Sequence, residues 1–472
     1  MTQGADAALD PLSSGALHAE LPGTATAFDA GAMRSHLHAA LIGPRGPAKV
    51  QRCTPDEAIL LDGPVVVVRY RLEVEDAAGC LRPALVTGRL FPAAARATEA
   101  ASRLAPLAAG ARGRAEVAPF AAPVAVIEPL AMLVHAFPID PELPTLIAAT
   151  DPTTATAVLG ELLGGRVRVD GCRAEPAHYN RRHRCMLRFH LDVAGGRELT
   201  LYGKVANDGS GAHTPAVVDA LRGTLAGAGV AVPECLGFRA DLQLVVFTAI
   251  PGVPRVAQLL KARLRDQPPP PGGPALEAAV ETCAQIAAAL HTGGLRLGPP
   301  RPLHAELARL RGQLVPIRRL SAALGGRLGD RLDLVEATAA ATPALEACQC
   351  HGDYSYTQLI FDGAQAGLVD FDNVCQAEPA LDLGQFLAYL RYAGLRARGG
   401  GEAEPGSVTE RLAERFLAAY VAAGGPAQAL PRVGVYEAVS LIRMAQHAWQ
   451  NLKGARLGNV LAVLDERLPP HR

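Results

Sequence analysis

The sequence predicts an α+β protein in which a β-rich first half is followed by a mainly helical second half. Strand patterns rich in β-branched and aromatic residues recur up to residue 265, as in the valine run at 65–68. The segment 266–274, DQPPPPGGP, excludes both helix and strand and predicts a stiff linker. Beyond it, apolar residues recur at helical spacing in the segments 276–291, 412–423 and 435–452.

Composition and charge place the chain among globular proteins. Of its 472 residues, 49% are hydrophobic and 19% are charged, which supports an ample core and two or three domains. Its 46 basic residues balance 46 acidic ones, which argues against a nucleic-acid partner and against a basic membrane-binding surface. The longest apolar run, 123–137, is interrupted by Glu128, and no secretion signal is visible. Nine scattered cysteines fit reduced thiols, so we expect a cytoplasmic protein without a membrane partner.

The β-rich half divides into a tail and two similar units. Residues 1–30 are small, polar and aperiodic, which predicts a mobile tail. The segments 31–148 and 149–265 then contain the same ordered patterns, including one predicted hairpin each, at 65–91 and 185–205. We interpret them as a duplicated unit of roughly 115 residues, although two unrelated antiparallel sheets would also share these strand patterns. A helical domain is expected over residues 275–472, after the linker at 266–274.

One short hairpin in the helical half carries the residues that best indicate chemistry. Its two apolar runs flank the Asp-Gly pair at 362–363, which is typical of a hairpin turn. If Phe361 pairs with Gly367, antiparallel pairing places Gln358 opposite Asp370. Amide and carboxylate oxygens suit a hard cation such as Mg²⁺. Asp353, in the loop before the first strand, is then expected to address a substrate hydroxyl.

This arrangement is what phosphoryl transfer requires. A metal ion neutralises charge on the phosphate that is transferred, and a carboxylate orients the attacking hydroxyl and accepts its proton. The alternative is a solvated hairpin with ordinary acids at its turn, which the order and strand placement of Asp353 and Asp370 disfavour. Asp372 can simply face solvent.

The motifs at 351–353 (HGD), 368–372 (LVDFD) and 378–384 (EPALDLG) resemble those of the aminoglycoside phosphotransferase family. That family has a bilobal, protein-kinase-like fold, with a β-rich N-lobe and a helical C-lobe. The resemblance implies that Asp353 is the catalytic base, that Asp370 binds the metal, and that Asp382 steadies the catalytic loop. The family usually has Asn where this chain has Gln358, although related sugar kinases, including maltokinase-like enzymes, can carry Gln there. The resemblance covers about the last 320 residues and is strongest over 350–390.

The resemblance also implies a nucleotide site in the unit 149–265. Lys204, at the end of a predicted strand, would reach the nucleotide phosphates; the alternative is a surface lysine at a sheet edge. The usual Gly-rich loop is replaced by the segment 178–184, which has no glycine. The segment 246–251 matches the hinge, so Phe247 and Ala249 are expected to bind the base, and ATP versus GTP stays open. In the first unit Arg89 stands where Lys204 stands in the second, which predicts a degenerate, N-lobe-like repeat.

We therefore expect a small-molecule kinase. It would transfer the γ-phosphate of ATP or GTP to a hydroxyl of a sugar, aminosugar or aminoglycoside, with Mg²⁺ held by Asp370 and Gln358. The alternative is a pseudokinase-like binding or scaffold protein without turnover, and the oligomeric state stays open. The cluster at 348–351, CQCH, resembles half of a metal site, but its second half is missing, so we interpret it as packing. His291 is interpreted as structural.

Overall fold

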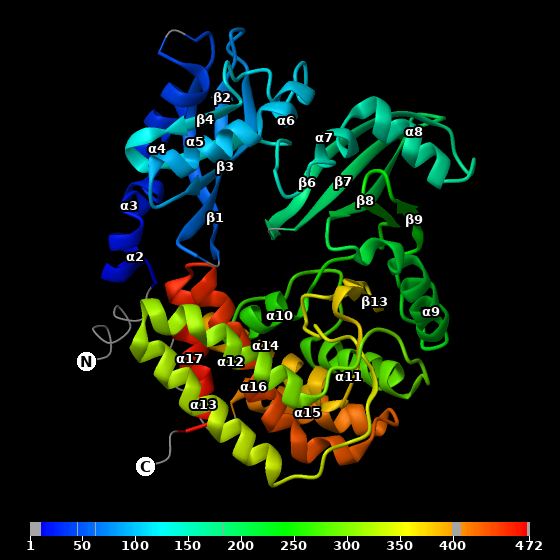
Figure 1. Ribbon diagram of the computed structural model, residues 1–472. Coiled ribbons are helices and arrows are strands. Elements are labelled where there is room, and N and C mark those ends of the chain that lie inside the picture. The colour runs from blue at the N-terminus through cyan, green and yellow to red at the C-terminus, as the bar shows by residue number, and fades with distance from the viewer. Residues whose placement is uncertain (1–10, 45, 62, 182, 399–406, 470–472) are drawn as a thin grey trace. The chain divides into compact units, whose positions relative to one another are not determined.

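The structure is a computed structural model that describes residues 11–44, 46–61, 63–181, 183–398 and 407–469 (Figure 1). Its contacts divide the chain into two compact units. The sheet unit contains the chain up to Ala212 together with Leu236–Phe247 and Trp449–Gly454. The helical unit contains His213–Cys235, Thr248–Ala448 and the chain from Ala455 onward. Helices and strands are both abundant, which confirms the predicted α+β class.

The first sheet has five antiparallel strands in the order β1-β2-β3-β5-β4. Helices from the start of the chain cover one face of this sheet. For example, the hydroxyl of Tyr70, on the second strand, donates to the carbonyl of Ala27 in one of these helices at 2.9 Å. The helix α5 (Ala94–Arg103) packs on β4 and β5 (Figure 1), and α6 (Ala105–Gly110) and η3 (Glu128–Leu130) complete this part. The strands are β1 (Lys49–Leu61), β2 (Val65–Glu75), β3 (Leu81–Leu90), β4 (Val124–Ile127) and β5 (Met132–Ala136).

The second sheet repeats the strand order of the first, as β6-β7-β8-β10-β9. Alternate residues of its second strand, including Leu187, Phe189 and Leu191, are buried in one core, as a half-buried strand requires. The helices α7 (Leu146–Ala149) and α8 (Pro152–Leu162) supply the other side of that core. The strands are β6 (Val169–Arg181), β7 (Arg184–Val193), β8 (Arg197–Ala206), β9 (Cys235–Arg239) and β10 (Leu244–Thr248).

The two sheets also agree in the register of their first three strands. In each, a glutamate on the first strand is paired with an arginine on the second, and that arginine with a residue of the third. The two rows are Glu57–Arg69–Thr87 and Glu175–Arg188–Tyr202. This correspondence supports the duplication, and the boundaries of the two units stay a prediction.

Part of the predicted mobile tail is folded, which corrects that expectation for residues 11–30. The chain forms η1 (Pro11–Ser13), α2 (Gly15–Glu20) and α3 (Thr24–Ala27) before α4 (Ala30–Leu37) and η2 (His38–Ile42). Leu17, Leu21 and Ala27 are fully buried. The side chain of Asp29 caps α4 by accepting from the backbone N–H of Ala32 at 2.7 Å. Burial of these few apolar side chains orders a segment whose composition alone predicts disorder; residues 1–10 lie outside the described part of the chain.

The helical unit confirms the periodicity after the linker, because helices cover all three predicted segments. Helices of this unit pack in pairs, α11 against α15, α12 against α13, and α10 against α14, and the rings of Phe386 and Phe416 stack with centroids 4.1 Å apart. Within the described residues, no helix combines the length and apolar character that a membrane span requires. The helices are α9 (Thr214–Ala226), α10 (Val256–Leu264), α11 (Leu276–Thr292), α12 (Leu303–Leu320), α13 (Ala322–Ala340), α14 (Ala380–Arg398), α15 (Val408–Ala422), α16 (Leu430–Gln450) and α17 (Gly454–Arg467), with short η4 (Ser210–Ala212) and η6 (Ala427–Ala429).

Candidate active site

The loop at 351–358 follows a short strand of the helical unit, β11 (Cys348–Cys350), which pairs antiparallel with β14 (Cys375–Ala377). Its second residue, Gly352, has a φ of 75°. A Cβ atom at Gly352 would lie 2.0 Å from the carbonyl oxygen of Asn373. Both the backbone angle and the close approach therefore require glycine, and they set the direction in which Asp353 leaves the loop.

A buried carboxylate accepts hydrogen bonds from the backbone of this loop. Asp382, in the first turn of α14, accepts hydrogen bonds from the backbone N–H of His351 at 2.7 Å and of Gly352 at 2.9 Å. The Nε2 of His291 lies 3.2 Å from the same carboxylate, and the hydroxyl of Tyr420 lies 2.9 Å from the Nδ1 of His291. A carboxylate can only accept, so His291 donates through Nε2, and in the charged form of the ring its Nδ1 donates to the hydroxyl oxygen of Tyr420.

The pKa values of this pair reflect their mutual interaction. Burial alone would raise the pKa of Asp382, but the hydrogen bond and charge of His291 hold it below its ordinary value. Burial alone would lower the pKa of His291, but its hydrogen bond to Asp382 raises it. The charged forms of both groups are therefore stabilised by each other inside the helical unit.

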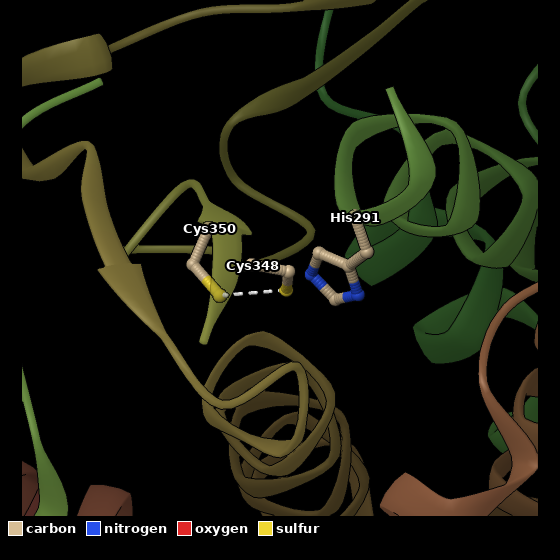
Figure 2. Close-up of side chains that lie close together, drawn as sticks. All are labelled: His291, Cys348 and Cys350. Carbon is tan, nitrogen blue, oxygen red and sulfur yellow. Dashed lines mark hydrogen bonds between the residues drawn. The ribbon is translucent and has the colours of Figure 1, made fainter. Parts of the chain in front are cut away.

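Two cysteines lie beside His291, as Figure 2 shows. The sulfur atoms of Cys348 and Cys350 are 3.8 Å apart, and one ligand atom from each of the three side chains lies within 4.8 Å of the others. The spatial partner of the cysteines is thus His291 from α11, not the neighbouring His351. Both ring nitrogens of His291 are already hydrogen-bonded, so packing and the Asp382 network account for the cluster.

Asp353 is half-buried, and two residues outside the predicted site, Gln385 and Arg301, hold it and its loop. The amide of Gln385 donates to Asp353 Oδ1. Gln385 lies three residues after Asp382 on α14, so helical spacing places both on one face and was a usable signal. Arg301 donates to the carbonyl of Gly352 at 3.0 Å from a segment just before α12. No local pattern could reveal that contact.

Arg301 is itself held by a buried acid. Its guanidinium makes two hydrogen bonds, of 2.9 and 3.0 Å, with Glu306, which is 3% exposed. Burial alone would raise the pKa of Glu306, but the hydrogen bonds from Arg301 and Arg309 lower it to about 2. A bidentate pair of this kind fixes the guanidinium plane, so the Gly352 carbonyl has a rigid donor.

The hairpin forms as predicted, but the predicted pairing of its two strands is wrong by one residue. The strands β12 (Leu359–Asp362) and β13 (Gln365–Leu368) pair Phe361 with Ala366, not with Gly367. Gln358 therefore faces Val369, whose N–H donates to the Gln358 carbonyl at 3.1 Å. The cause is the turn, which has two residues and begins at Gly363 with a φ of 59°. A two-residue turn shifts every pair by one relative to the three-residue turn that the expected register needs.

Gln358 and Asp370 nevertheless converge. Asp370 adopts left-handed backbone angles, φ 67° and ψ 69°, where the chain leaves β13 for η5 (Phe371–Asn373). The Nε2 of Gln358 then donates to Asp370 Oδ2 at 3.5 Å. One amide and one carboxylate within reach of each other form a donor set that fits a hard divalent cation, with the amide turned to present its oxygen.

Positive charge surrounds Asp353 on the side of α14 and α16. Desolvation and the nearby Arg301 lower the pKa of Arg443, while Asp353 acts in the opposite direction. Burial and the Asp353 carboxylate raise the pKa of Tyr389, which Arg443 and Arg456 oppose. Asp353 thus lies within electrostatic reach of Arg443.

The predicted nucleotide residues lie on the second sheet and at its end. Lys204 is 4% exposed on β8, which lies between β7 and β10, so it is not a surface lysine at an edge. Phe247 belongs to β10, and Ala249 follows the end of that strand. The segment 178–184 is mostly strand, because β6 extends to Arg181 and β7 begins at Arg184, and Arg182 lies outside the described residues. Arg89, the counterpart of Lys204, forms a 2.8 Å salt bridge with Glu142.

Comparisons with known proteins add a family match. A model of the phosphotransferase enzyme family matches residues 188–436, more than half of the 472-residue chain. No curated protein matches the chain. A choline/ethanolamine kinase family protein from Mesorhizobium loti is similar in structure, with 17% identity, a TM-score of 0.44, and coverage of 67% of this chain and 97% of its own. A glucosamine kinase has 15% identity, a TM-score of 0.45, and coverage of 88% and 94%. Macrolide 2'-phosphotransferase type I has 17% identity, a TM-score of 0.41, and coverage of 67% of this chain and 98% of its own.

Proposed function

The chain belongs to the phosphotransferase enzyme family, and we propose that it transfers the γ-phosphate of ATP or GTP to a hydroxyl group of a small molecule. The observation that carries the proposal is the loop at 351–358. Asp382 and Arg301 hold its backbone, and Asp353 projects from it next to the Gln358–Asp370 pair of the following hairpin. Phosphoryl transfer depends mainly on the positioning of the reacting groups and on charge stabilisation. A loop backbone held at several points positions the Asp353 carboxylate.

Asp353 acts as the base in this proposal. Its carboxylate accepts the proton of the acceptor hydroxyl while the oxygen of that hydroxyl forms a bond to the γ-phosphorus. The bond between the γ-phosphorus and the bridging oxygen breaks, and the nucleoside diphosphate leaves with that oxygen. Gln385 donates to one oxygen of Asp353 and so orients the carboxylate.

Asp370 and Gln358 would hold the divalent cation. Bound there, Mg²⁺ would neutralise charge on the nucleotide phosphates. Lys204 is proposed to contact the same phosphates, and the backbone groups of Phe247 and Ala249 to bind the base. Because Lys204 is almost fully buried, an anion such as a nucleotide phosphate would stabilise the charged form of its ammonium group.

The charges around Asp353 favour a neutral acceptor over a polycationic one. Arg443 and Arg456 lie near the base, because the pKa of Arg443 responds to the Asp353 carboxylate and the pKa of Tyr389 responds to Asp353 and to both arginines. Among the acids of the helical half that could bind the amino groups of an aminoglycoside, Glu402 and Glu404 lie outside the described residues, and Glu410 is hydrogen-bonded by Arg391 at 2.9 Å. Within this family we therefore favour a sugar hydroxyl.

An acceptor panel tests this preference. With MgATP and the purified protein, we expect kcat/KM for neutral sugars such as glucose or maltose to exceed that for kanamycin by about tenfold or more, because like charges brought together weaken binding. The variant Arg443→Gln should narrow the difference, whereas Arg415→Gln, at an exposed position of α15, should not. A faster reaction with kanamycin than with every neutral sugar would contradict the charge argument.

Removing the metal-binding acid gives a second test. Asp370→Ala should abolish the Mg²⁺-dependent part of the thermal stabilisation by ATP, because one of two oxygen ligands is lost. The matched control is Asp362→Ala, an exposed aspartate of the same hairpin. Thermal shift with ATP, in Mg²⁺ and in EDTA, measures the difference. If Asp370→Ala retains the full Mg²⁺ effect, the cation is held elsewhere, and if the wild type shows none, the pseudokinase alternative gains support.

A further inference from the structure

A tyrosine of the second sheet is held by side chains of the first. Tyr179 lies near the end of β6, in the segment 178–184, which has no glycine and stands where a Gly-rich phosphate loop was expected. Its side chain is buried. Both sheets belong to the sheet unit, so the contacts described next are made within one compact part of the structure.

Side chains of the first repeat surround the ring of Tyr179. The guanidinium carbon of Arg69 lies over the ring, 3.6 Å from its centroid. The ring of Phe137 meets it edge to face, with centroids 5.8 Å apart. The Tyr179 hydroxyl donates to the carboxylate of Asp140. Burial and the charge of Asp140 raise the pKa of Tyr179 well above its ordinary value, so the hydroxyl keeps its proton and remains the donor.

The segment 137–142, which follows β5, makes further contacts with the second sheet. Asp140 accepts from the backbone N–H of Glu142 at 2.7 Å. The carboxylate of Glu142 lies 2.8 Å from Arg89 and 3.9 Å from the Nδ1 of His183, just before β7. The backbone carbonyl of Glu142 accepts from the side chain of Asn207, just after β8. This segment therefore contacts β6, β7 and β8 at the same end of the second sheet.

Lys204 lies near that end, on the other face of the sheet. Cross-strand pairing places Lys204 opposite Met186, and Met186 opposite His178. Directly opposed residues share a face. Tyr179, the next residue along β6, packs with Cys185 in the core of the second sheet and so faces the opposite side. The segment 137–142 thus holds, from the core side, the strands that carry Lys204.

The correspondence between the two repeats indicates what the first one binds. In its sheet, β5 takes the place that β10 takes in the second. The segment after β10 is proposed to bind the nucleotide base, whereas the segment after β5 binds the Tyr179 hydroxyl through Asp140. Arg89, the counterpart of Lys204, pairs with Glu142 of that segment. Groups of the first repeat that correspond to proposed nucleotide-binding groups are therefore engaged by the protein itself.

We propose that the first repeat positions the phosphate site of the second, with Asp140 and Glu142 as positioning residues. By holding the ends of β6, β7 and β8, they place the Lys204 ammonium for the nucleotide phosphates before the nucleotide binds. Strand ends with few contacts open readily, and a group that is already ordered costs less free energy to use in binding. This inference rests on the proposed function, because it takes Lys204 as a ligand of the phosphates.

Removing the hydroxyl of Tyr179 tests the proposal. Tyr179→Phe loses the hydrogen bond to Asp140 but keeps the ring beside Arg69. We expect it to weaken the binding of ATP or GTP with Mg²⁺ by about tenfold, while KM for the acceptor stays near that of the wild type. Isothermal titration of the full-length protein measures the nucleotide affinity, and steady-state kinetics measures KM.

A double-mutant cycle shows whether the effect passes through this hydrogen bond. Asp140→Ala removes the acceptor and should also weaken nucleotide binding. Because both substitutions break the same bond, adding Tyr179→Phe to Asp140→Ala should cause no further loss. Fully additive losses would show that the two residues act separately and would contradict the proposed positioning.

Two further variants separate this inference from the proposed function. Tyr70→Phe also loses a buried hydrogen bond, of 2.9 Å to Ala27, and should lower the melting temperature without changing the nucleotide affinity. Lys204→Ala should weaken nucleotide binding at least as much as Tyr179→Phe. If Lys204→Ala weakens binding but Tyr179→Phe lowers only the melting temperature, this inference alone is overturned. If the wild type binds no nucleotide, or Lys204→Ala leaves binding intact, the proposed nucleotide site is wrong and the inference falls with it.

Discussion

Replacing Asp353 by asparagine should lower kcat by about 10²- to 10⁴-fold, the range of a lost general base. Asparagine keeps the shape of the side chain and its hydrogen bond to Gln385 but cannot accept the hydroxyl proton. The nucleotide affinity should stay close to that of the wild type, because Asp353 is proposed to act on the acceptor. Steady-state kinetics with the best acceptor, together with a nucleotide binding titration, separates the two effects.

The control for Asp353→Asn is Asp362→Asn, the same substitution at an exposed position of the neighbouring hairpin. It should leave kcat and the nucleotide affinity unchanged. Turnover by Asp353→Asn within a few-fold of the wild type would show that another group accepts the proton. A parallel loss of nucleotide affinity would mean that the substitution has disturbed the phosphate site.

Asp382→Ala should destabilise the helical unit by about 3–5 kcal/mol, the range observed when one partner of a buried ion pair is removed. The substitution leaves the N–H groups of His351 and Gly352 without an acceptor and leaves His291 buried beside a cavity. Amide hydrogen exchange of the segment from β11 to α14 measures the loss. The control is Asp333→Asn, whose 2.7 Å salt bridge with Arg311 lies on the surface and should contribute roughly 0–1 kcal/mol.

The pH dependence of that loss follows from the two pKa shifts. The pKa of Asp382 is lowered, so its contribution is complete above the ordinary value of 3.8 and disappears as the pH falls through the folded value. The pKa of His291 is raised, so its contribution is complete below 6.5 and disappears as the pH rises through the folded value. The difference in stability between the wild type and Asp382→Ala should therefore be largest between pH 3.8 and 6.5. A difference that stays constant from pH 4 to 9 would show that the pair is not ionised.

The hairpin at 359–368 shows which structural features local sequence patterns can predict and which they cannot. Its existence was predictable, because Asp-Gly marks a turn between two apolar runs. Its register was not, because two- and three-residue turns fit the same letters and differ by one position in every pair. Gln358 and Asp370 still lie close together in the observed register, because Asp370 adopts a left-handed backbone conformation. That conformation depends on the packing of the chain after β13.

By itself, the sequence determined the α+β class, the order of two β-rich units and a helical half, and Asp353, Gln358 and Asp370 as the candidate site. These features reside in short motifs and in hydrophobic periodicity, which record the local conformation and the buried face of each element. Only the tertiary structure decided how the candidate site is supported, through His291, Arg301 and Tyr420. It also decided that Arg69 and His135, on neighbouring strands of the first sheet, are almost completely removed from water. The physical reason is that a polar side chain becomes costly or useful only when distant segments remove it from water, and the spacing of residues along the chain does not record which segments will do so.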